Sequence, residues 1–249
     1  MGAAYDTYDY PSYWESREYE HKAELIAIQS FLERTSKIKT ILEVGAGYGR
    51  LTPSYLSYAP RIVLTDPSSK LLKIARSNFK SKKVRFIQSS VENIPKKIRQ
   101  SSIDLVIMVR VLHHIEDLHK TFHAISKIIQ KNGYLILEFA NKRHLKATLS
   151  EFFKGNFTFP LDIFTIEIRT KKRKRSLPFK NYHPDTILDI LKGHGYKIIE
   201  IRSVSNVRNS FLKRILPKNV LLSIENLLQR PFARFSFGPS IFILAKKVN

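Results

Sequence analysis

The stretch that decides the fold is TILEVGAGYGR, which spans residues 40–50. Its first five residues form a short apolar run, as in a buried strand, and three glycines spaced two apart follow directly. Glycine lets the backbone turn tightly and lets a ligand approach with no Cβ in the way. Pro53 then stands where the first turn of a helix tolerates proline. The stretch therefore predicts a strand, a glycine loop and a helix.

The rest of the chain repeats this alternation of strand and helix. The expected strands are 40–44, 61–65, 83–87, 103–109, 134–139, 196–201 and 240–245, and the expected helices are 20–34, 69–79, 119–130 and 184–191. Strands that are apolar throughout are typical of a parallel sheet covered on both faces. We therefore expect one α/β domain over residues 1–249, doubly wound, with a mostly parallel seven-stranded sheet.

Two segments interrupt the alternation and are predicted to be helical insertions after strands five and six. They are residues 141–183 and 206–236. The first holds five phenylalanines within residues 152–164, followed by six cations within residues 169–175. Such phenylalanines ordinarily belong to a core. Because this insertion follows a strand end, where open α/β sheets bind ligands, the cluster also favours an apolar or flat substrate.

Three details of the glycine loop indicate what it binds. Glu43 lies two residues before the first glycine, the third glycine comes two residues after the second, and Asp66 ends the second strand. A dinucleotide fingerprint would need its third glycine at the position of Arg50. An acid beside the loop disfavours a diphosphate but suits a ligand with an ammonium group and a sulfonium. Asp66 suits the hydroxyls of a ribose.

From about Tyr13 to Phe139, the chain resembles the class I S-adenosylmethionine-dependent methyltransferases, in particular their type 11 small-molecule group. The matching stretches are ILEVGAGYGRLT (41–52), VLTDPSSKLLKIAR (63–76), FIQSSVENIP (86–95), IDLVIMVRVLHHIEDLHKTFHAISKIIQKNGYLILEF (103–139) and the later HPDTILDILKGHGYKIIEI (183–201). The resemblance implies a Rossmann-like class I fold, S-adenosylmethionine as cofactor and methyl transfer to a small-molecule acceptor, which it does not identify. The phenylalanines and cations of the first insertion are what favour a lipid-like or aromatic acceptor.

The resemblance also implies roles for particular residues. The cofactor-binding positions would be Tyr13, Glu43, Gly45, Ala46, Gly47, Gly49, Asp66, Pro67, Ser90, Val91, Val109 and Arg110. Ser90 stands where the family usually carries the aspartate that holds the adenine amino group. Residues 1–39 would form an N-terminal lid and helix, 40–140 the cofactor-binding core, and the two insertions a substrate cap.

Histidines gather after the fourth strand. His113 and His114 begin the segment that borders the substrate, so either is a candidate general base or substrate contact and both are predicted as catalytic. His119 and His123 are four residues apart on one helix. A metal site needs at least three converging ligands, however, so we expect no metal here.

Composition narrows the remaining functions. The absence of cysteine excludes disulfides, thiolate zinc sites and cysteine nucleophiles. The formal charge of +22 would attract nucleic acid, anionic lipid or acidic substrates, although excess lysine is also simply solvated on helix faces. Residues 141–183 carry eleven Lys and Arg against three Asp and Glu. Genome bias would spread the excess evenly, so an anionic lipid surface or a phosphorylated substrate is a candidate partner, with nucleic acid less favoured.

Two other classes of function remain open. The charge alone supports an RNA methyltransferase or RNA-binding protein, but the chain lacks an Asn-Pro-Pro-Tyr-like tetrapeptide and any cysteine for cytosine chemistry. A non-catalytic interaction module is the other class, against which the intact glycine loop stands. The acidic, tyrosine-rich N-terminus is unlike a secretory signal, and the longest apolar run, 105–112, is broken by Arg110. We therefore expect a cytoplasmic protein without a transmembrane segment.

Overall fold

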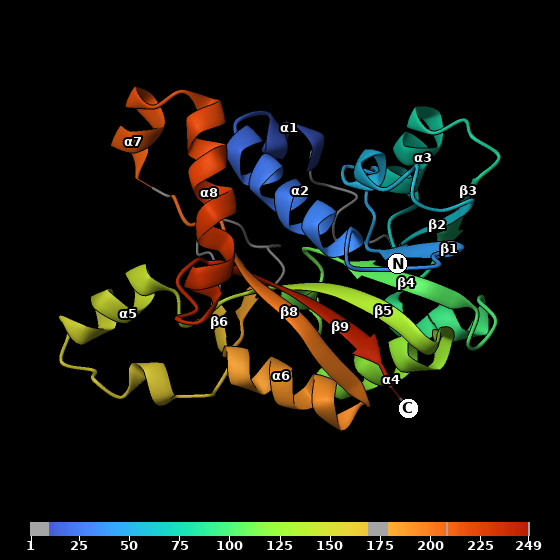
Figure 1. Cartoon of the computed structure of the whole chain (residues 1–249). Coiled ribbons are helices and arrows are strands. Elements are labelled where there is room, and N and C mark those ends of the chain that lie inside the picture. Colours follow the sequence, from blue (N-terminus) through green and yellow to red (C-terminus); the bar gives the residue numbers. More distant parts are fainter. Residues whose placement is uncertain (1–9, 169–178, 208, 249) are drawn as a thin grey trace.

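The computed structural model of the protein describes residues 10–168, 179–207 and 209–248. Its centre is a seven-stranded sheet with the strand order β3-β2-β1-β4-β5-β9-β8 (Figure 1). These strands are β1 (Thr40–Val44), β2 (Arg61–Asp66), β3 (Val84–Gln88), β4 (Ile103–Met108), β5 (Ile129–Ala140), β8 (Tyr196–Val204) and β9 (Ser240–Lys247). The first five run parallel, whereas β9 lies antiparallel between β5 and β8. This confirms the predicted doubly wound, mostly parallel sheet.

The described residues form eight α-helices, several of which cover the two faces of this sheet. They are α1 (Tyr10–Glu15), α2 (Glu18–Leu32), α3 (Ser69–Asn78), α4 (Leu118–Ile128), α5 (Leu145–Phe152), α6 (Pro184–Gly193), α7 (Ser210–Ile215) and α8 (Lys218–Ala233). α4 and α6 belong to one apolar core, while α2 and α3 belong to the other (Figure 1). Adjacent strand residues therefore enter different cores: Leu42 packs on one face and Ile41 on the other. Burial on both faces explains why the strands are apolar throughout.

Side-chain caps fix where the helices leave the carboxyl edge of the sheet. The Ser68 hydroxyl accepts a hydrogen bond from the Leu71 backbone N–H at 3.1 Å and starts α3 just after β2. The Asp117 carboxylate accepts one from the Lys120 N–H at 2.9 Å and starts α4 after β4. Such caps satisfy N–H groups that have no partner within the helix. They hold the ends of β2 and β4 and the segments that follow in fixed positions.

The helix predicted after the glycine loop is not an α-helix. Only Thr52–Ser54 is helical there, as a single 3₁₀ turn. The Ser54 hydroxyl donates to the Leu51 carbonyl oxygen at 2.7 Å and so competes with the helical backbone, while the Thr52 hydroxyl donates to the Glu43 carboxylate at 3.0 Å. The sequence pattern alone did not show this competition.

The boundary between α4 and β5 also differs from expectation. α4 ends at Ile128, and β5 begins at Ile129 rather than at Tyr134. Ile129 pairs with Ile103 of β4 before the register shifts. Asn132 adopts a left-handed φ of 65°, so the Asn-Gly pair bends the strand instead of ending the helix.

The insertion over residues 141–183 is only partly helical. Besides α5 it contains a 3₁₀ turn (Phe159–Leu161) and a two-stranded antiparallel sheet, β6 (Ile166–Ile168) with β7 (Phe179–Asn181), which the sequence pattern did not predict. The second insertion is helical as expected and forms α7 and α8. Residues 1–9 and the basic run at 169–175 lie outside the described residues.

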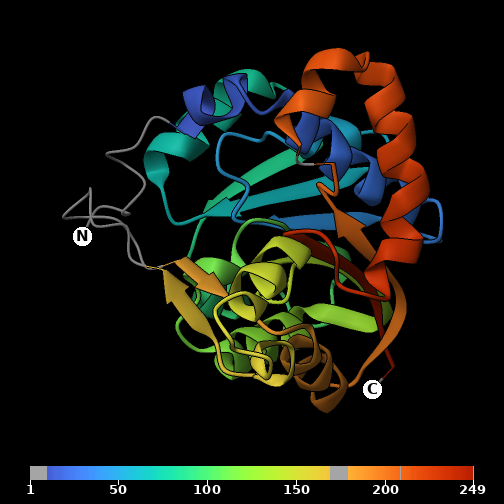
Figure 2. The same ribbon diagram turned by 90° about the vertical axis from the view of Figure 1, so that its left-hand side faces the viewer.

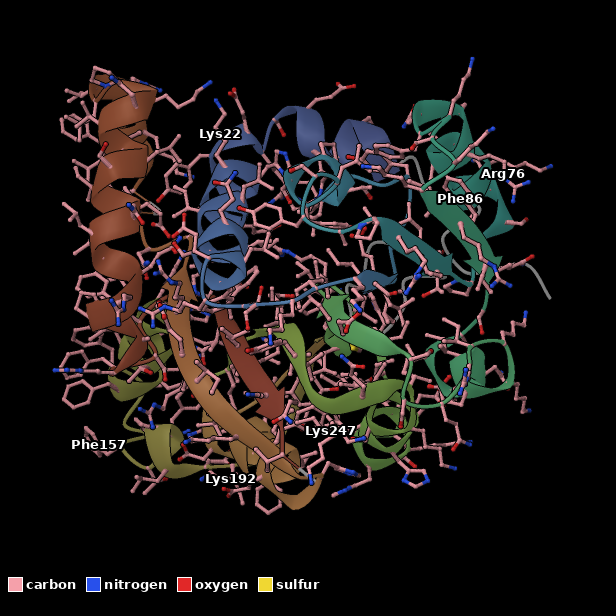
Figure 3. The ribbon with its side chains drawn as sticks, turned by 45° about the vertical axis from the view of Figure 1, so that its right-hand side comes forward. Lys22, Arg76, Phe86, Phe157, Lys192 and Lys247 are labelled. Atoms are coloured by element: carbon pink, nitrogen blue, oxygen red, sulfur yellow. The ribbon has the colours of Figure 1, made fainter. Side chains whose placement is uncertain are left out.

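Both insertions leave the same edge of the sheet. The first follows β5 and the second follows β8, and these two strands point the same way because each is antiparallel to β9. This edge forms the left-hand side of Figure 1 and faces the viewer in Figure 2. The margin of the sheet formed by β3 lies away from this edge. At that margin the guanidinium carbon of Arg76 lies 5.4 Å from the ring centroid of Phe86 (Figure 3). Within the described residues, no helix is long and apolar enough to cross a membrane.

Candidate cofactor site

A cavity of about 660 Å³ opens at the carboxyl ends of β1, β2 and β4. Its walls come from the glycine loop, the end of β2, residues 89–93, and residues 110–111 and 114–117. This size falls within the range of pockets that hold small-molecule cofactors. Its place is where parallel α/β sheets bind ligands, because the loops after neighbouring strands meet there.

The glycine loop is held in place by Asp66. The Gly47 N–H donates to one carboxylate oxygen of Asp66 at 2.9 Å, and the Ser68 N–H donates to the other at 2.8 Å. Asp66 is 6% exposed, and both it and Gly47 line the cavity. Each carboxylate oxygen has a second lone pair, so the group can still accept hydrogen bonds from a ligand's hydroxyls.

The three glycines of the loop share a backbone conformation but differ in the space around them. All have left-handed φ values, +68° at Gly45, +57° at Gly47 and +83° at Gly49. A Cβ on Gly45 would clash with Val111, and one on Gly49 would clash with the ring of Phe79. A Cβ on Gly47 would meet only Leu71 Cδ1, at 3.9 Å. Gly47 alone is therefore open on its ligand side.

The structure divides the predicted site residues into two groups. The cavity is lined by Gly45, Gly47, Asp66, Pro67, Ser90, Val91, Arg110 and His114. Tyr13, Glu43, Ala46, Gly49, Val109 and His113 do not line it. Tyr13 packs edge-on against Trp14 in α1, and the Ala46 backbone braces the loop through hydrogen bonds to Thr65 and Gly49. Sequence spacing identified the loop but not which of its neighbours reach the ligand space.

Glu43 lies beneath the loop. Its carboxylate is 3% exposed and accepts hydrogen bonds from the hydroxyls of Thr52, at 3.0 Å, and Tyr55. Burial raises the pKa of Glu43 to about 7, and the two hydroxyls offset only part of that rise. Its role is therefore to support the loop from below, at a position where its charge depends on pH near neutrality.

Replacing Glu43 with glutamine should make folding stability less sensitive to pH. In the folded protein the pKa of Glu43 is about 7, above its ordinary 4.5, so the wild-type protein loses stability as pH rises from about 4.5 through 7. Glutamine cannot ionise. Between pH 5 and pH 8, the unfolding free energy of the wild type should therefore fall relative to that of Glu43→Gln by up to about 3 kcal/mol. Urea unfolding at both pH values measures it, with Glu15→Gln at an exposed position as the control; parallel behaviour of the two variants would contradict the prediction.

His113 and His114 occupy different environments. His113 is 5% exposed and stacks on Phe179 with 4.3 Å between ring centroids. Burial, followed by the nearby His114 and Arg110, holds the pKa of His113 well below its ordinary value. Its ring is therefore neutral and packs against Phe179. His114 lines the cavity.

A buried carboxylate that the sequence analysis missed ties the N-terminal helices to the cavity. Glu24, in the middle of α2, is fully buried. It accepts hydrogen bonds from Arg50 at 2.6 Å and from Arg110 at 2.5 and 2.7 Å. Trp14 of α1 stacks on Arg50, with 3.6 Å from the guanidinium carbon to the ring centroid. The signal available in the sequence was a glutamate beside Ala23 and Ala27 on an otherwise apolar helix face.

Arg110 is held from two sides. Its backbone has a left-handed φ of 62°, and its N–H donates to Glu138 at 2.7 Å at the end of β5. Burial raises the pKa of Glu138. Burial would also raise the pKa of Glu24, but the two arginines outweigh it and lower that pKa below its ordinary value. Glu24 is thus ionised, and the guanidinium of Arg110 is fixed at the cavity wall.

The far end of the cavity is polar and lacks a carboxylate at the position of Ser90. Ser90 accepts a hydrogen bond from the Asn93 side-chain amide at 3.0 Å, and the Ser89 N–H donates to the Asp66 carbonyl oxygen at 3.1 Å. Val91 supplies an apolar wall. Polar edges on an apolar wall, next to the carboxylate of Asp66, fit a nucleoside.

Together, the sheet order, the glycine loop and the carboxylate after β2 define a nucleoside-binding α/β domain of the methyltransferase kind. Residues 42–137 match the model of the methyltransferase domain family. Within residues 42–137, the chain thus matches the class I S-adenosylmethionine-dependent methyltransferase domain that the order of its motifs predicted.

Individual proteins agree with this classification. The "Probable S-adenosylmethionine-dependent methyltransferase CRG1" of Saccharomyces cerevisiae is 31% identical to this chain over 99 residues. The aligned stretch covers 38% of this chain and 33% of that protein. A demethylmenaquinone methyltransferase of Chlamydia pneumoniae is 29% identical over a stretch that covers 45% of this chain and 49% of that protein. The chain thus spans half or less of the length of these relatives. A crystal structure of an S-adenosylmethionine-dependent methyltransferase from Thermotoga maritima shares the fold with a TM-score of 0.67, at 17% identity and 98% coverage of both chains.

Proposed function

We propose that the protein binds S-adenosylmethionine in the cavity at the carboxyl edge and transfers its methyl group to a small-molecule acceptor. The observation that carries the proposal is the Gly47–Asp66 hydrogen bond, because it joins an open glycine loop to a carboxylate on the same cavity wall. In this arrangement Asp66 would accept hydrogen bonds from the ribose hydroxyls. Ser90 and Val91 would contact the adenine, and Gly45 and Gly47 would face the methionine portion.

The demands on this chain's side chains are modest. A bound sulfonium supplies an electrophilic methyl group without enzymatic activation. The protein has to align the acceptor with that group, exclude water and remove a proton where the acceptor requires it. Two residues that line the cavity are suited to these tasks: Arg110, whose guanidinium is held by Glu24, to orienting an acceptor, and His114 to taking a proton.

We assign the acceptor-facing role to His114 rather than His113. His114→Ala should lower turnover by about 10²–10⁴-fold if it is the general base, and should remove one limb of the pH–rate profile. His113→Ala should instead lower stability by removing the contact with Phe179, while leaving the pH profile unchanged. Turnover and thermal unfolding of both variants separate the two roles. Equal turnover in His114→Ala and wild type would place the base elsewhere.

A small-molecule acceptor is supported by one relative, which is named for demethylmenaquinone. The RNA-directed alternative rests on the charge of +22.

Calorimetric titration tests the proposal at its first step. S-adenosylmethionine and its demethylated product should each bind saturably at one site, and nicotinamide dinucleotides should not, because the third glycine is displaced and Glu43 adjoins the loop. Binding of a dinucleotide at micromolar concentration without binding of S-adenosylmethionine would overturn the assignment.

A further inference from the structure

The helix α5 turns its apolar stripe to solvent. Leu145, Leu149, Phe152 and Phe153 recur at the spacing of one helix face, and they are 41%, 45%, 52% and 82% exposed. No residue of α5 is buried. An amphipathic helix ordinarily packs this stripe against the core. In the described part of the chain, α5 has no such packing.

The loop after α5 continues this exposed surface. Phe157, Leu161 and Phe164 are 66%, 78% and 79% exposed. Phe157 packs edge-on against Phe152 with 5.0 Å between ring centroids and lies at the margin of the molecule (Figure 3). The phenylalanine cluster was predicted to be mostly core, and that prediction is wrong: of its five members only Phe159 is buried.

The loop is fastened from beneath, so its outward side chains are held in place. Lys142 is 2% exposed, and its ammonium group donates to the carbonyl oxygens of Asp162, at 2.7 Å, and Phe164, at 2.8 Å. The His183 Nε2 atom lies 3.0 Å from the Pro160 carbonyl oxygen. Because a buried lysine satisfies these carbonyl groups, the loop has a defined conformation and is not poorly packed.

A second exposed apolar segment lies on the same edge of the sheet. In α7, Phe211, Leu212 and Ile215 are 65%, 40% and 58% exposed. α7 follows β8 as α5 follows β5, and both helices lie on the side of the molecule that faces the viewer in Figure 2. We call the exposed apolar side chains of residues 145–164 and 211–215 the carboxyl-edge surface. The cavity opens at the same edge.

Charge on the carboxyl-edge surface is cationic. The two acids within residues 145–164 are paired with lysines, Glu151 with Lys154 at 2.7 Å and Asp162 with Lys142 at 2.8 Å. Lys146 and Arg214 are exposed beside the apolar residues. The whole chain adds a long-range field of formal charge +22.

We propose that the carboxyl-edge surface docks on an anionic lipid bilayer, with α5 and its loop entering the interface. Apolar side chains on protruding segments, flanked by cations, are the pattern of interfacial attachment, in which burial and attraction to anionic headgroups add. Docking goes beyond the proposed function and does not depend on methyl transfer. It would bring the cavity mouth to the bilayer, from which an amphiphilic acceptor can enter.

Co-sedimentation with vesicles tests the proposal without cofactor or acceptor. The full chain should bind vesicles of phosphatidylcholine with phosphatidylglycerol, and bind less at high salt or on phosphatidylcholine alone. The double variant Phe153→Ser with Leu161→Ser should bind at least about tenfold more weakly. Tyr58→Ser removes an exposed ring, 41% accessible, three residues before the amino end of β2, and should bind as the wild type does.

Unchanged thermal unfolding of the double variant would show that it is folded, as expected for exposed positions. Vesicle binding by that variant equal to wild type would overturn the proposal, as would a wild-type protein that binds neither kind of vesicle. If the wild-type protein bound no vesicles but formed a dimer, and the double variant were monomeric, the proposal would be overturned in favour of docking on a second copy of this chain.

Discussion

Replacing Glu24 with alanine is expected to lower the free energy of unfolding by about 3–5 kcal/mol, because it leaves two guanidinium groups without their shared carboxylate. The side chains of Arg50 and Arg110 are only 10% and 24% exposed, so water cannot fully replace the lost partner. The two cations would also repel each other across the vacated space. Urea unfolding at neutral pH measures the change.

Glu20→Ala provides the matched control on the same helix. Glu20 pairs with Lys213 at 2.7 Å, but both side chains are about one quarter exposed. Partly exposed ion pairs contribute little, so this variant should lose less than about 1 kcal/mol. If Glu24→Ala were no less stable than Glu20→Ala, the buried carboxylate would not be what holds α2 to the loop and to Arg110.

The sequence predicted the sheet because each strand carries its own evidence. A strand such as Ile103–Met108 is apolar at nearly every position, and such a run buried on both faces has few alternatives in a chain of alternating helices. The evidence for the glycine loop was equally local, since the strand, the three glycines and Asp66 all lie within the 27 residues of 40–66. The order of motifs along the chain then indicated the family.

What the sequence did not show depends on contacts between distant segments. Glu24 and Arg110 are 86 residues apart, and no local pattern pairs them. His113 and His114 are adjacent in sequence, yet His113 stacks on Phe179 of a distant segment whereas His114 lines the cavity. The phenylalanine cluster was misassigned to the core because hydrophobicity predicts burial only when another element is there to cover the side chains. In each case tertiary packing decided between alternatives that local sequence left equal.

The second large effect is expected at Gly47, where valine should reduce the affinity for S-adenosylmethionine at least about 100-fold. A side chain at Gly47 meets only Leu71 at 3.9 Å on the protein side, and both residues line the cavity, so the isopropyl group would occupy space that the methionine portion needs. The left-handed φ of +57° adds about 1–2 kcal/mol of strain for any residue with a Cβ. Backbone strain alone would also destabilise the folded protein, so the loss of stability has to be separated from the loss of cofactor binding.

Gly155 makes that separation possible, because it has a left-handed φ of +84° and no atom within 4 Å of an added Cβ. It lies just after α5, far along the chain from the glycine loop, so Gly155→Val introduces comparable backbone strain without filling the cavity. Both variants should unfold at somewhat lower temperature than wild type, but only Gly47→Val should lose cofactor binding in calorimetric titration. A folded Gly47→Val protein that binds S-adenosylmethionine within tenfold of the wild-type affinity would show that this cavity is not the cofactor site.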